Sequence, residues 1–166
     1  NYTDIGAGIR FDLGSSDSLY VGRSGMIGST DNNGVFGNGS SRSVTVEGTV
    51  TSATTGITLF DNGSQITITA TGVVSGDVSA INMQGAQNRI SNDGLILGFV
   101  TFNGQSVLRN TGTIYSIETT INCFGNEAQQ LYNTGLIEGD SASYAANDAF
   151  GIAVNTIRNA GVMIGD

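Results

Sequence analysis

Apolar residues recur along the chain in short alternating runs that are each followed by a glycine. Seven such glycines stand 18 to 26 residues apart. Each has an apolar residue four positions before it, another two positions after it, and Ser or Gly four positions after it. Alternation of this kind is typical of a strand with one side turned inward. The seven glycines are Gly25, Gly48, Gly72, Gly94, Gly112, Gly135 and Gly161.

Three apolar columns emerge when the units are aligned on this glycine. The column before it contains Val21, Val44, Ile68, Ile90, Leu108, Leu131 and Ile157. The column after it contains Ile27, Val50, Val74, Ile96, Ile114, Ile137 and Met163. The third contains the pairs Ile9/Phe11, Ile57/Leu59, Ile81/Met83, Val100/Phe102, Ile121/Cys123 and Ile152/Val154, and the second unit fits it only loosely around Val35. Each unit therefore predicts three strands.

Three strands per unit predict an all-β fold, a right-handed parallel β-helix or β-solenoid. We expect about seven rungs of roughly 22 residues each, in a single domain that covers residues 1–166. The repeated glycine is expected at a bend that needs a left-handed or otherwise strained backbone. Cys123 is expected to be a small core residue, and as the single cysteine it excludes an intrachain disulfide.

An asparagine stands two positions before the glycine in the last four units. If these residues stack at one corner, each side-chain amide can bond to the next, which predicts a structural ladder. The first three units carry Arg23, Val46 and Ala70 at this position, so the ladder is expected to be partial. Its members are Asn92, Asn110, Asn133 and Asn159.

Charge and composition narrow the range of partners and chemistry. The net charge is −8, all six basic residues are arginines, and no basic run occurs. Nucleic acid and anionic membranes are therefore poor partners, and acidic polysaccharide is expected to be repelled in bulk unless cations bridge it. The chain has no histidine, which removes the commonest general base and zinc ligand. No apolar stretch approaches the length of a membrane span.

One connection is longer than the others, from Gly135 to Ile152, and we expect it to be a loop. It carries Glu138, Asp140, Tyr144 and Asp148, which makes it a candidate binding or acid–base segment. Glu118 and Asp140 fall at nearly the same corner of adjacent rungs, where two carboxylates could share a calcium ion. The alternative is a solvated acidic loop without a ligand. Calcium is the one cofactor that the sequence suggests.

A second candidate lies three positions before the glycine, where side chains should point outward. The last rungs place Arg109, Tyr132 and Arg158 there. Such a row could contact a glycan, with tyrosine offering a flat surface and arginine a hydrogen-bonding fork. The alternative is that these residues are simply the polar outer side of the sheet.

The segments "ISNDGLILG", "LRNTGTIYS" and "LYNTGLIEG" resemble the degenerate repeats of bacterial right-handed parallel β-helix proteins. That group includes autotransporter-type passengers and secreted surface proteins, and it belongs to the pectin-lyase-like superfamily. The resemblance covers nearly the whole chain. It implies an extracellular or cell-surface location and a β-helix, but it does not choose among the activities of that fold.

The leading hypothesis is a non-enzymatic stalk or adhesin module that binds a glycan or another cell-surface ligand. The alternative is a carbohydrate-active enzyme such as a polysaccharide lyase, which could work with arginine and calcium instead of histidine. The threonine-rich runs suggest an ice-binding solenoid as a further alternative. Exposed strand edges tend to pair with other chains. We therefore expect either a segment of a longer solenoid or end-to-end self-association.

Overall fold

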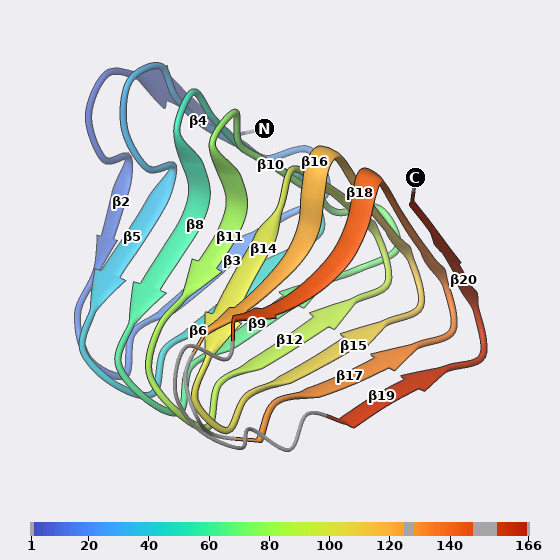
Figure 1. Ribbon diagram of the computed structural model, residues 1–166. Helices are drawn as coiled ribbons and strands as arrows, with labels where there is room; N and C mark the ends of the chain where they lie inside the picture. Colours follow the sequence, from blue (N-terminus) through green and yellow to red (C-terminus); the bar gives the residue numbers. More distant parts are fainter. Residues whose placement is uncertain (1, 125–127, 148–155, 166) are drawn as a thin grey trace.

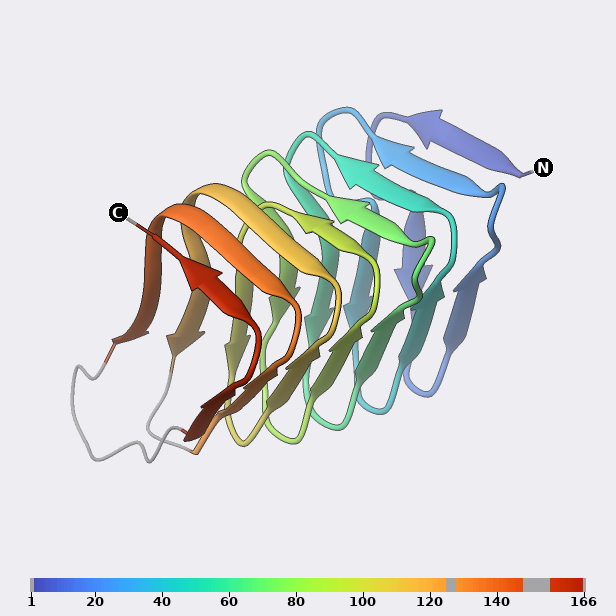
Figure 2. The same cartoon turned by 90° about the vertical axis from the view of Figure 1, so that its right-hand side faces the viewer.

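The computed structural model describes residues 2–124, 128–147 and 156–165. All regular structure in these residues is β, and every strand pairing is parallel. The strands stack as a β-solenoid with three strands per turn, as predicted (Figure 1). Six turns separate Leu19 from Ile157, an average of about 23 residues per turn. The two ends of the chain lie at opposite ends of the stack (Figure 2).

Three faces enclose the core, and we number them in chain order. The first face contains β1 (Thr3–Gly6), β4 (Met26–Ser29), β7 (Thr49–Ser52), β10 (Val73–Ser75), β13 (Leu95–Leu97), the beginnings of β16 (Thr113–Phe124) and β18 (Leu136–Asn147), and β20 (Val162–Ile164). The second contains β2 (Phe11–Leu13), β5 (Val35–Asn38), β8 (Thr55–Phe60), β11 (Ser79–Met83), β14 (Val100–Asn103) and the ends of β16 and β18. The third contains β3 (Ser18–Val21), β6 (Ser43–Val46), β9 (Gln65–Ile68), β12 (Arg89–Asn92), β15 (Val107–Asn110), β17 (Gln130–Asn133) and β19 (Thr156–Asn159).

The described residues form no helix long and apolar enough to cross a membrane.

The interior consists of stacked columns of aliphatic side chains. On the first face the predicted column from Ile27 to Met163 is confirmed, because each member pairs in register with the next. Its members from Ile27 to Ile137 are at most 2% exposed. Burial of one such side chain contributes about 1.5–3 kcal/mol. The repeat therefore stabilises each turn through the turns on either side of it. Cys123 is buried in the second face, as expected.

The register of the third face corrects two of the predicted positions. Val44 pairs with Leu19 and Ile66, whereas Val21 and Ile68 pair with Val46 and lie in the column of the asparagines. The alignment on glycine was wrong by two residues in these turns, because the turn between strand and glycine is longer there. Arg23 and Ala70 therefore do not occupy ladder positions.

The second face needs two corrections as well. Its first inward pair is Phe11/Leu13 rather than Ile9/Phe11. In the last turn the backbone of β18 pairs Tyr144 with Ile121 and Ala146 with Cys123. Tyr144 and Ala146 therefore occupy the paired positions that were predicted for Ile152 and Val154. Ile152 and Val154 lie outside the described residues. The chain passes from the first face to the second earlier than the pattern indicated.

The asparagine ladder is confirmed at the corner between the third and first faces. The Nδ2 of Asn92 donates to the Oδ1 of Asn110 at 2.7 Å, Asn110 donates to Asn133 at 2.8 Å, and Asn133 donates to Asn159 at 2.8 Å. The same amides also donate to backbone carbonyls, such as that of Thr113. The ladder therefore satisfies buried polar groups and links four successive turns.

Six of the seven repeated glycines, from Gly48 to Gly161, are required at this corner by close packing against the preceding turn, not by backbone strain. None of the seven has a φ in the left-handed region, so the predicted reason was wrong. A Cβ on Gly112 would overlap the carbonyl oxygen of Gly94, and a Cβ on Gly135 would overlap that of Gly112. Adjacent turns approach so closely here that only a residue without a side chain fits.

A second polar ladder lies at the corner between the second and third faces, and the sequence analysis missed it. The backbone N–H of Arg42 donates to Ser64 Oγ at 3.2 Å. The N–H of Ser64 donates to Asn88 Oδ1 at 2.8 Å, and that of Asn88 donates to Ser106 Oγ at 3.2 Å. All four residues are at most 2% exposed. Buried polar side chains therefore satisfy backbone donors in turn after turn at a corner where strand pairing is interrupted.

Arg42 enters the core at this corner. Its Nε donates to the carbonyls of Leu13 and Gly14 at 3.1 Å each, and its Nη1 donates to the carbonyl of Phe60 at 2.9 Å. A Cβ on Gly37 would lie only 2.7 Å from its Cδ and Nε atoms, so the glycine makes room for the guanidinium. Burial lowers the pKa of Arg42 below its usual value, although nearby carboxylates oppose this effect.

Candidate binding surfaces

Arg109, Tyr132 and Arg158 form one row on the outer side of the third face. They occupy paired positions on β15, β17 and β19, so the predicted row is present in the structure. The guanidinium carbon of Arg109 lies 4.6 Å from the centre of the Tyr132 ring, and that of Arg158 lies 5.8 Å from it. These distances are within the range of cation–π contacts. We call these three residues the arginine–tyrosine row.

The tyrosine ring is packed between the two guanidinium groups. Arg109 comes from the turn before Tyr132 and Arg158 from the turn after it, so each arginine covers one face of the ring. The ring is therefore not the open flat surface that the sequence suggested. Its hydroxyl donates to Gln130 Oε1 at 2.9 Å, which fixes the ring further. Tyr132 thus stacks against both arginines, which are themselves exposed.

Neither arginine of this row has an acidic partner among the described residues. The single ion pair in that part of the chain joins Arg10 and Asp4. Both Arg109 and Arg158 are exposed. Arg89, on β12, is a third exposed arginine of this face and precedes Arg109 by one turn. No described outward position of the seven strands is acidic. A chain of net charge −8 therefore presents a locally cationic surface.

Tyr20 lies in the same outward column, at the other end of the third face. A hydrogen bond to the Glu47 carboxylate raises the pKa of the Tyr20 hydroxyl above its usual value, with smaller contributions from burial and from the charge of Glu47. The N-terminal end of this face therefore has tyrosine beside an acid, whereas the C-terminal end has tyrosine between two arginines.

The acidic segment after Gly135 differs from its predicted form. As far as Asn147 it is part of β18 rather than a loop, because its backbone pairs with β16. Glu138 pairs with Tyr115 on the first face. The side chains of Asp140 and Tyr144, and all of Asp148, lie outside the described residues. The proposed use of this segment as a binding or acid–base site stays a prediction.

The carboxylate pair suggested as a calcium site is placed by its backbone only. Glu118 and Asp140 each precede a residue of the paired positions Thr119 and Ser141, so their backbones lie on neighbouring strands. Their side chains lie outside the described residues. Among the side chains that are described, no group of three or more acidic or cysteine residues could hold a metal ion. Calcium binding stays a prediction.

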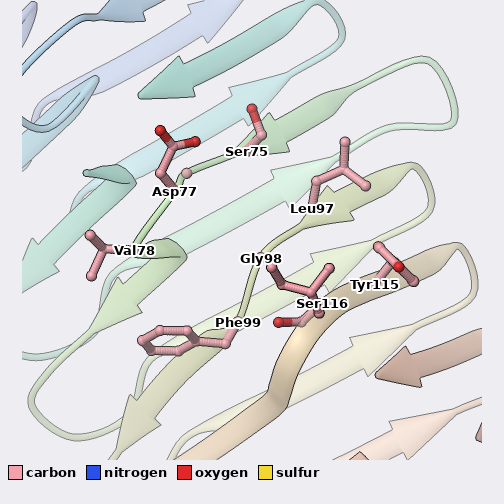
Figure 3. Close-up of a pocket in the computed structure, with 10 residues that line it drawn as sticks. Ser75, Asp77, Val78, Leu97, Gly98, Phe99, Tyr115 and Ser116 are labelled. Carbon is pink, nitrogen blue, oxygen red and sulfur yellow. The ribbon is translucent and has the colours of Figure 1, made fainter. Parts of the chain in front are cut away.

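A groove of about 690 Å³ lies at the corner between the first and second faces (Figure 3). It runs across three turns, and the labelled side chains surround Gly98, with Val78 and Phe99 to one side of it and Leu97 and Tyr115 to the other. Gly98 has a φ of 114°, and a Cβ there would lie 2.8 Å from the carbonyl oxygen of Gly76. The column of Ser and Gly after each repeated glycine was the sequence signal for this corner.

The surface that lines this groove is mostly apolar. Val78 is 59% exposed and Ile117 is 70% exposed, and Asp77 is the one carboxylate among the lining residues that the structure describes. A smaller adjoining hollow of about 260 Å³ shares Val78 and Phe99 and is lined otherwise by hydroxyl and amide side chains. These surfaces can hold an uncharged ligand by contact and hydrogen bonding. Among the described lining residues there is no pair of carboxylates for acid–base work.

No family model matches the chain, and no curated protein or solved structure matches it. The resemblance to bacterial surface β-helix proteins therefore rests on the repeat pattern alone. What the chain does has to be argued from its surfaces.

Proposed function

We propose that this chain is a non-enzymatic module of a secreted or cell-surface β-solenoid that acts as a stalk or adhesin and binds carbohydrate through the arginine–tyrosine row. The observation that carries the proposal is the stacking of Arg109 and Arg158 on Tyr132, with both guanidinium groups exposed and without an acidic partner among the described residues. Arginine forks form paired hydrogen bonds with oxygen-rich ligands.

The rest of the fold supports this proposal through its stiffness. The row stands on three successive strands of a parallel sheet. Two of them, β15 and β17, each have a buried leucine and a buried asparagine on the inner side, whereas Ile157 on β19 is 44% exposed. Side chains on β15 and β17 keep their spacing, because the backbone under them is hydrogen-bonded on both sides, whereas β19 pairs with β17 alone in the described sheet. A binding surface that is ordered before the ligand arrives loses less entropy on binding.

The proposal is tested by measuring binding of the whole chain to a panel of immobilised glycans. We expect at least one glycan to bind, and we expect Tyr132→Ala to weaken that binding at least about tenfold, because the arginines lose the ring that orders them. Tyr20→Ala is the matched control. It removes a tyrosine from the same outward column but from outside the row.

Circular dichroism of both variants should show that the fold is kept. If no glycan binds, or if both variants bind as the unchanged protein does, the row is not the binding surface. The same glycans should be followed for unsaturated products by their ultraviolet absorbance, with and without calcium. A rise in absorbance would replace the proposal with the lyase hypothesis.

A further inference from the structure

The arrangement of the arginines on the third face indicates a more specific ligand than carbohydrate in general. Arg89, Arg109 and Arg158 stand on β12, β15 and β19, which are the fourth, fifth and seventh strands of the stack. With about 4.8 Å between adjacent strands, Arg109 and Arg158 are about 10 Å apart along the axis, and the three arginines span about 14 Å. Arg109 and Arg158 share one outward column, whereas Arg89 pairs with Val107 and so stands two residues along the strand from that column. The cations are therefore spread along the solenoid rather than gathered in a cluster.

The described surroundings of these arginines are mostly uncharged. The residues that flank β15 and β17 at the corners are Ser106, Thr111, Gln129 and Thr134. The described acid beside them is Asp93, which follows β12 and accepts a hydrogen bond from Thr111 Oγ1. Glu127, three positions before β17 in the sequence, lies outside the described residues. Salt screens charges beyond about 8 Å at physiological ionic strength, so acids on the other two faces act weakly here. The local field, not the net charge, determines what this face attracts.

We infer that the ligand of this face is an anionic polysaccharide whose chain lies along the solenoid axis, with carboxylate or sulfate groups on the forks of Arg109 and Arg158. This inference rests on the proposed carbohydrate binding. Because Tyr132 occupies the space between the two arginines, the face offers little open ring for stacking on sugars, and recognition falls to the guanidinium groups.

A polysaccharide fits this face better than other polyanions do. The row is one residue wide, which suits a single chain with widely spaced charges. Nucleic acid binding typically neutralises many phosphates, and this face has three arginines in a chain of net charge −8. A membrane surface would extend beyond the row to the corners, where Glu47 and Asp93 stand.

The experiment measures binding of the whole chain to heparin, to polygalacturonate, to neutral dextran and to single-stranded DNA. It also measures binding to vesicles of phosphatidylcholine and phosphatidylserine in a ratio of roughly 3:1. We expect binding to one or both anionic polysaccharides, and we expect the affinity to fall about tenfold as salt rises from roughly 50 to 200 mM. Binding to dextran, vesicles and DNA should be much weaker.

Variants then locate the site. The double variant Arg109→Ala with Arg158→Ala should lose most of the binding, whereas Arg23→Ala, which removes an exposed arginine from the turn after β3, should bind as the unchanged protein does. Arg109→Lys with Arg158→Lys keeps the charge and loses the fork. It should bind more weakly than the unchanged protein and more tightly than the alanine pair.

The outcomes separate this inference from the proposed function. Binding of dextran as tight as that of the anionic chains, without salt dependence, would overturn the inference and leave carbohydrate binding standing. Tighter binding of vesicles or DNA would overturn the ligand class. An unchanged affinity in the alanine pair would overturn the site, and the absence of binding to every polysaccharide would overturn both proposals.

Discussion

Replacing Asn110 with alanine tests how strongly the asparagine ladder holds successive turns together. Asn110 is 1% exposed. Its Oδ1 accepts from Asn92, and its Nδ2 donates to Asn133 Oδ1 at 2.8 Å and to the carbonyl of Leu136 at 3.1 Å. Alanine removes all of these bonds at once. The variant also keeps an unstrained backbone, since it adds no atoms to the close contacts at this corner.

The loss of stability in Asn110→Ala can be estimated from the hydrogen-bond partners that Asn110 leaves behind. Asn133 Oδ1 would be left as a buried acceptor without its donor, which costs about 1–3 kcal/mol. Asn92 keeps its bond to the carbonyl of Thr113 and loses only one partner, which costs about 0.5–1.5 kcal/mol. We therefore expect the free energy of unfolding to fall by about 2–4 kcal/mol.

Denaturant unfolding followed by circular dichroism measures this change. The control is Asn159→Ala, at the exposed end of the ladder, where a single ladder bond is lost and the expected fall is below about 1.5 kcal/mol. Hydrogen exchange should place the weakening of Asn110→Ala in the turns on either side of it, because repeat proteins couple mainly to their nearest neighbours. A fall below about 0.5 kcal/mol, or one no larger than that of the control, would refute the reasoning.

Three further changes test other features. Gly37→Ala should destabilise the fold by about 1–3 kcal/mol, because the new Cβ collides with Arg42, and the effect in thermal unfolding should shrink when Arg42 is also alanine. Gly112→Ala should destabilise the fold more than a typical surface substitution does, since adjacent turns would have to separate. Equal melting temperatures of this variant and the unchanged protein would contradict this expectation. Glu47→Ala should lower the pKa of Tyr20 towards its usual value in an NMR titration. Because the folded-state pKa is raised, the contribution of this hydroxyl to stability is present below about pH 10 and is lost as the pH rises through the folded-state pKa.

The repeat pattern predicted most of the fold because its columns are also the contacts of the core. Ile27, Val50 and the later members of their column were aligned correctly, since the spacing from the glycine to the next strand is constant. The spacing before the glycine is not constant, and so Val21 and Ile68 were shifted by two residues. Alternation alone cannot detect such a shift, because a slip of two residues keeps the same side inward.

The site was predicted in part. Arg109, Tyr132 and Arg158 were placed in one row from their distance to the glycine, and that placement is confirmed. The stacking of both guanidinium groups on the Tyr132 ring could not be predicted from the residue spacing, because it depends on side-chain rotamers. The groove around Gly98 was missed because its apolar lining comes from three turns and has no shared motif. Ser64 and its partners in the second ladder were missed because their residue types vary from turn to turn.

The asparagine ladder also gives the solenoid a direction. From Asn92 to Asn133 each amide donates to the next asparagine toward the C-terminal end of the stack, so their dipoles are aligned head to tail. Hydrogen bonds in such a chain polarise one another, which strengthens each bond by about 10–30%. An interior amide is polarised from both sides and a terminal amide from one. A turn added beyond Asn159 would therefore meet amide donors, and one that carried an acceptor at the same corner would extend the aligned row.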